Sequence, residues 1–95
     1  MSNIMKEMIE ITKRMDYILH RREEILKRSE EIKQQWLLTS NLIDIRSRSR
    51  GKVAELFAEE GKLLDELDDC VNENHKLLEE LEELRRRVEK LKEES

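Results

Sequence analysis

Apolar residues recur every seven positions along this chain of 95 residues. In the second half they form one column of leucines with a single cysteine, and a companion column begins three residues earlier. This is the heptad pattern, written abcdefg with apolar residues at a and d, by which α-helices wrap around one another. The pattern predicts a leucine-zipper-like coiled-coil segment over residues 53–95.

The first half carries the same repeat, built on isoleucine. Counting back in sevens from Val88 gives thirteen positions, of which nine are apolar and the first five are isoleucine. A partner column lies four residues after each isoleucine, so residues 1–45 are predicted to form a second coiled-coil segment. The predicted oligomer interface consists of Ile4, Met8, Ile11, Met15, Ile18, Ile25, Ile32, Val53, Leu56, Leu63, Leu67, Cys70, Asn74, Leu77, Leu81, Leu84, Val88 and Leu91.

The two segments are separated by a basic break at residues 46–52, where the isoleucine column changes from d to a. One architecture is an all-α, elongated coiled coil, in which a continuous helix of about 140 Å joins a parallel dimer or small bundle. The alternative is an antiparallel helical hairpin that turns near residues 46–51. The column keeps its phase across the break, which favours the continuous helix, whereas Gly51 and the serines favour the turn.

A third apolar column widens the stripe in the second half. Column e is apolar, while column g carries Glu59, Glu66, Glu73 and Glu80. A two-stranded coil needs only two apolar columns, so the pattern indicates a third or fourth helix. That helix comes from further copies of the chain or from a partner with basic and apolar residues. The partner-binding candidates are Trp36, Leu38, Leu42, Ile45, Phe57, Leu64, Val71 and Leu78.

Two seam positions carry residues with special chemistry. Asn74, at a, is predicted to fix the register by bonding to its own copy in a parallel neighbour, or else is a tolerated polar interruption. Cys70, at d, is predicted to act as a small apolar residue; in a parallel dimer it also supports a redox crosslink. His20 and His75 lie far apart in the sequence and are predicted to be surface residues, so no metal site is expected.

The basic break offers a second kind of chemistry. Arg46, Arg48, Arg50 and Lys52 form either a solvated collar or a contact site for phosphates, including those of nucleic acid. Ser47 and Ser49 lie between the arginines, and phosphate groups there would offset the four cations. We regard the nucleic-acid role as the alternative, because the basic region of a bZIP protein is a longer helix that begins well upstream of the first leucine, whereas apolar and acidic residues precede Arg46 here.

Composition limits the functional classes. With 44% charged residues, 3% aromatic residues and no proline, the chain can build a stripe but no broad globular core. Period seven argues against disorder. We find no phosphate loop, no nucleophile with a nearby base, and no apolar stretch of membrane-spanning length. The single cysteine and the absence of Asn-x-Ser/Thr acceptors predict an intracellular location, cytoplasmic or nuclear.

The sequence therefore predicts a structural coiled-coil protein that is not an enzyme and needs no cofactor. Its expected function is oligomerisation, as a scaffold or adaptor for protein–protein interaction in a larger assembly. Its expected partners are its own copies and other helical proteins. We expect no membrane association, and nucleic acid is a less favoured partner. The alternative function is a nucleic-acid-binding helical dimer or hairpin arm that uses residues 46–52.

Overall fold

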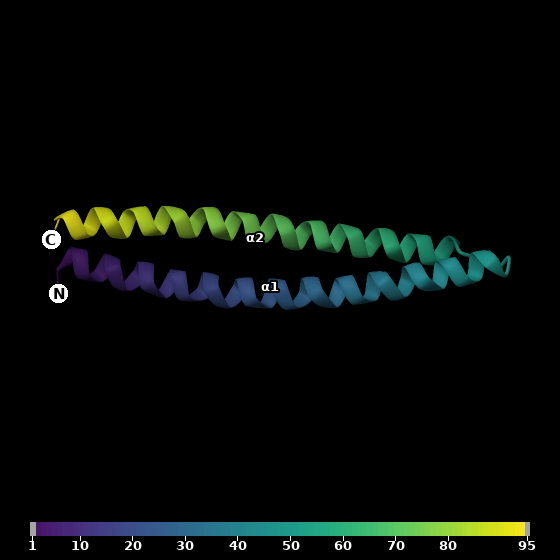
Figure 1. Cartoon of the computed structure of the whole chain (residues 1–95). Helices are drawn as coiled ribbons and strands as arrows, with labels where there is room; N and C mark the ends of the chain where they lie inside the picture. The colour runs from purple at the N-terminus through teal and green to yellow at the C-terminus, as the bar shows by residue number, and fades with distance from the viewer. Residues whose placement is uncertain (1, 95) are drawn as a thin grey trace. The chain divides into compact units, whose positions relative to one another are not determined.

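Two long helices make up the computed structural model, which describes residues 2–94 (Figure 1). Helix α1 spans Asn3–Arg48 and helix α2 spans Ala54–Glu94, and the described residues include no strand. The predicted all-α class is therefore confirmed. Contacts divide the chain into two units: unit 1 contains Met1–Glu24 and Glu73–Ser95, and unit 2 contains Ile25–Asn72.

Unit 2 is an antiparallel helical hairpin, the second of the two architectures that the sequence allowed (Figure 1). Helix α1 ends in a Schellman motif: the Gly51 N–H donates to the Arg46 carbonyl oxygen at 2.8 Å, and the Arg50 N–H donates to that of Ser47 at 3.3 Å. Arg50 adopts φ 58°, in the left-handed region. A continuous helix through the break, which the phase of the column favoured, is not observed.

The physical reason is that a heptad repeat specifies the buried face of a helix but does not specify which chain supplies the neighbouring helix. A left-handed arginine costs about 1–2 kcal/mol. Burying a single seam leucine or isoleucine contributes about 1.5–3 kcal/mol, so a few seam contacts offset the turn. The left-handed position falls on Arg50 rather than on Gly51, the residue that suggested a turn in the sequence.

Each unit has its own core, built from the predicted a and d columns. In unit 1, Ile11, Ile18, Leu77, Leu81 and Leu91 are buried. In unit 2 the buried apolar residues are Ile25, Ile32 and Leu63. All residues of the predicted oligomer interface are buried or half-buried within this single chain. Their assignment to contacts between chains stays a prediction.

Candidate partner-binding surface

Column g of each helix carries ion pairs between α1 and α2. In unit 1 three pairs are bidentate: Glu7 with Arg87, Arg14 with Glu80, and Arg21 with Glu73, with N–O distances of 2.5–3.0 Å. In unit 2, the Arg28 Nη2 lies 2.5 Å from a carboxylate oxygen of Glu66. Each step of seven residues forward along α1 is matched by seven backward along α2, so these pairs define an antiparallel register.

These interhelical ion pairs alter the chemistry of column g. Hydrogen bonds from Arg87, Arg21 and Arg14 lower the pKa values of the paired carboxyl groups, namely Glu7, Glu73 and Glu80 respectively. The sequence suggested that the glutamates of column g bind a basic partner. Arginines of the same chain instead form ion pairs with three of the four, namely Glu66, Glu73 and Glu80. The signal missed in the sequence is the heptad spacing of Arg14, Arg21 and Arg28.

Three polar contacts at or beside the seam are made within the chain. In unit 1, the Arg22 Nε donates to the Asn74 Oδ1 at 3.0 Å, so Asn74 faces Arg22 here rather than its own copy. In unit 2, the Ser40 hydroxyl donates to Glu60 at 2.9 Å. The buried Thr39 hydroxyl donates to the Gln35 carbonyl oxygen at 2.9 Å in the same helix. Asn74, Glu60 and Thr39 are thus each hydrogen-bonded to a group of the same chain.

Cys70 is a free, half-buried thiol in unit 2. The register of the ion pairs places its d position opposite Ile25, another d residue. A half-buried position opposite an isoleucine fits the role of a small apolar seam residue. The crosslink between two copies stays a prediction that concerns a parallel dimer.

Large apolar side chains remain exposed mainly on the other flank of each helix, at columns e and b. These columns are neighbours on a helix surface because they are four residues apart. Nine of the thirteen exposed large apolar residues lie there: Met5, Ile9, Leu19 and Leu78 in unit 1, and Leu26, Leu37, Phe57, Leu64 and Val71 in unit 2. The other four, at c and g, are Tyr17, Leu38, Leu42 and Ile45.

The partner-binding candidates from the sequence are therefore divided between two flanks. Phe57, Leu64, Val71 and Leu78 share the e/b flank of α2, whereas Leu38, Leu42 and Ile45 lie on the opposite flank of α1. Trp36 is half-buried at an a position. The exposed e/b residues of α1 were not among the predicted candidates, although Leu19 and Leu26 directly follow two isoleucines of the seam.

In unit 2 the e/b flank contains an apolar groove of about 200 Å³. Its lining residues are Lys33, Trp36, Leu63, Leu64 and Leu67. The Trp36 indole Nε1 is buried there without a hydrogen-bond acceptor among the described residues. The groove thus opens from the hairpin seam towards an exposed leucine.

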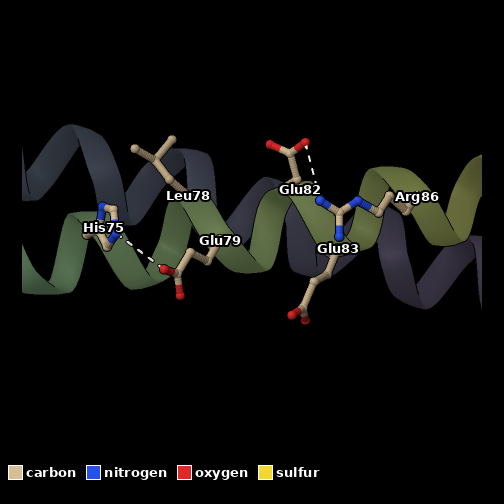
Figure 2. A pocket seen from close by; sticks show the side chains of 6 residues that line it. All are labelled: His75, Leu78, Glu79, Glu82, Glu83 and Arg86. Atoms are coloured by element: carbon tan, nitrogen blue, oxygen red, sulfur yellow. Dashed lines mark ion pairs between the residues drawn. The ribbon is translucent and has the colours of Figure 1, made fainter.

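The α2 flank of unit 1 is also hollowed. A surface depression of about 420 Å³ is lined by His75, Leu78, Glu79, Glu82, Glu83 and Arg86, all from α2. Figure 2 shows Leu78 and Glu82 on the same side of the helix, with Glu83 on the opposite side. His75 pairs with Glu79 at 3.2 Å and Glu82 with Arg86 at 3.8 Å, both within the helix. Exposed leucine beside acid is therefore characteristic of this flank.

The basic break lies at the turn of unit 2. Arg48 pairs with Asp44 at 3.2 Å, while Arg46, Arg50 and Lys52 make no ion pair within residues 2–94. The Ser49 hydroxyl donates to backbone carbonyl oxygens of α1, at 3.2 Å from those of Ile45 and Arg46. Ser47 is exposed, so both serines lie at the surface of the turn.

Residues 2–94 contain no cluster of three or more side chains suited to a metal ion. His20 is exposed, and a hydrogen bond between its Nδ1 and the Asp16 carbonyl oxygen raises its pKa. Neither helix, as described, has a stretch long and apolar enough to cross a membrane.

Comparisons with protein-family models, with curated proteins and with solved structures gave no match.

Proposed function

We propose that this chain is a non-enzymatic coiled-coil scaffold or adaptor that oligomerises and presents helical surface to protein partners in a larger assembly. The supporting observation is the exposed apolar flank at columns e and b. The a and d columns are already covered by the antiparallel helix of the same chain, yet most of the exposed large apolar residues gather on one flank. Exposed apolar patches mark interaction sites on protein surfaces.

The surface chemistry supports partner binding over catalysis. The groove in unit 2 is lined by four apolar side chains and one lysine, and no nucleophile is paired with a base there. Helix-in-groove recognition needs apolar anchors at heptad spacing, and Phe57, Leu64 and Val71 supply that spacing.

Photo-crosslinking in cells tests this function. A photoreactive amino acid at Leu64 or Val71 should crosslink to one defined protein, either a partner or a second copy. The matched control places it at Asp65 or Asn72, which are exposed on α2 at column f. Equal crosslinking from both pairs of positions, or none from either, would contradict the proposal.

A nucleic-acid-binding helical arm is the second candidate function. Three cations of the turn have no acid partner within residues 2–94, which leaves them available to phosphates. Fluorescence anisotropy with a labelled duplex at low ionic strength tests this role. Binding should weaken steeply with salt and disappear when Arg46, Arg48, Arg50 and Lys52 are replaced by alanine; no binding at low salt would eliminate this function.

A further inference from the structure

We propose that the e/b flank of unit 2 binds a cationic amphipathic helix of another protein. This inference rests on the proposed scaffold function and specifies the chemistry of the partner. Its apolar contact surface consists of Leu26, Leu37, Phe57, Leu64 and Val71, and the groove lies within it. The e/b flank supplies anchors from both helices, since the ion-pair register places Leu26 of α1 opposite Val71 of α2.

The size of this surface suits one helix. Phe57 and Val71 are fourteen residues apart on α2, which corresponds to about 21 Å of helix. Leu26, Leu64 and Val71 are 57%, 45% and 58% exposed, so a neighbour can cover about half of each side chain. Gly61 lies at b between Phe57 and Leu64, and a Cβ at this residue would meet no atom within 4 Å. The flank thus has open space for close approach.

Charge decides the nature of the partner. Column b, which borders the apolar side chains on both helices, carries no lysine or arginine in unit 2; its charged residues are Glu30, Asp44 and Asp68. Asp44 already pairs with Arg48, whereas Glu30 and Asp68 make no ion pair within residues 2–94. An apolar stripe between two acidic borders is complementary to a helix with leucines on one face and lysines or arginines beside them.

The same rule disfavours a second copy. Two e/b flanks packed face to face would bring one acidic column b against another. Lys33 is the single basic residue at e or b in this unit, and it lies in the groove rather than along the border. Like charges facing each other oppose association, so a basic partner is favoured over self-association through this flank.

Unit 1 repeats the acidic column b, although its column e also carries Arg85 and Lys92. Its exposed apolar residues at e and b, Leu19 and Leu78 among them, are accompanied at b by Asp16, Glu23, Glu82 and Glu89. No lysine or arginine occupies column b here either. The acidic border is therefore a repeated property of the flank rather than an accident of two residues.

Two model peptides of three heptads test the inference on the full chain. Both carry leucine at i, i+3, i+4 and i+7; one has lysine at the bordering positions and the other has glutamate. Fluorescence anisotropy should show binding of the lysine peptide that weakens with added salt, and none of the glutamate peptide. The Leu64→Glu and Asp68→Lys variants should each bind about tenfold more weakly.

Matched controls keep the result specific. Leu38→Glu changes an exposed leucine on the opposite flank, and Asp69→Lys changes the neighbouring acid at column c; both should bind as the unmodified chain does. Circular dichroism confirms that each variant keeps its helices. Equal losses in the test and control variants would overturn the assignment of this flank.

The outcomes separate the inference from the proposed function. Preference for the glutamate peptide would overturn the inference and leave a scaffold with a different partner. Light scattering could instead show a dimer that Leu64→Glu dissolves, with no binding of either peptide. This result would also overturn the inference and would identify a second copy as the occupant of the flank. No peptide binding, no crosslinks and no self-association would overturn both.

Discussion

Replacing Arg50 by glycine tests the turn that makes unit 2 a hairpin. Arg50 has φ 58°, and a left-handed conformation costs a non-glycine residue about 1–2 kcal/mol. Glycine removes this cost, but its greater conformational freedom stabilises the unfolded chain by about 0.4–1 kcal/mol. The net expectation is an increase of about 1 kcal/mol in the free energy of unfolding.

The sign of the effect discriminates between the two architectures. In a continuous helix, position 50 would be interior, and glycine there would lower stability by about 1 kcal/mol. For a domain of this size, 1 kcal/mol corresponds to a Tm change of about 4–8 °C. We therefore expect Arg50→Gly to raise the Tm, measured by circular dichroism at one fixed protein concentration because oligomerisation also shifts Tm.

Two controls isolate the backbone effect. Arg50→Ala removes the charge but keeps the side-chain Cβ, so it should not reproduce the gain. Gly51→Ala places a Cβ 3.4 Å from the Arg46 carbonyl oxygen, an ordinary contact at a residue without positive φ, so it should not lower the Tm and should raise it through the lower entropy of the unfolded chain. A lower Tm for Arg50→Gly, or equal gains for glycine and alanine, would refute the reasoning.

Three further expectations concern the seam and its flank. The interhelical ion pairs lower the pKa values of their carboxyl groups. The stabilisation from these pairs is therefore present above the unfolded pKa of about 4.3 and is lost as the pH falls through the lower folded pKa values. Urea unfolding should give a lower free energy of unfolding at pH 3 than at pH 6, and equal values would contradict this expectation. Asn74→Ala leaves Arg22 without its hydrogen-bond acceptor and should lower the free energy of unfolding by about 1–3 kcal/mol. Replacing both residues by leucine should restore it. Chemical denaturation measures the free energy of unfolding of both variants. Ile25→Cys should form an intramolecular disulfide with Cys70 on mild oxidation, detected as a monomer band that migrates faster on a non-reducing gel. Ile18→Cys, one heptad away, should form none. Equal disulfide formation by both variants would rule out the antiparallel register in which Cys70 lies opposite Ile25.

The sequence determined the helical class and the buried face of each helix. The period of seven is a local property, since residues i, i+3 and i+4 share a face of any helix whatever lies beside it. Ile18 and Leu63 could therefore be assigned to a seam without knowledge of their neighbours. The exposed e column of α2 was equally readable, because Leu64 and Val71 repeat at the same spacing.

Only the tertiary structure decided what lies opposite each face. The antiparallel pairing, the partnership of Arg22 with Asn74 and the neutralisation of column g by arginines all join residues far apart in the sequence. A heptad repeat is equally compatible with a neighbour from the same chain or from another, because both bury the same columns. The turn at Arg50 makes the neighbour a helix of the same chain. The ion pairs between α1 and α2 then occupy the flank at column g, and the e/b flank remains as the exposed apolar surface.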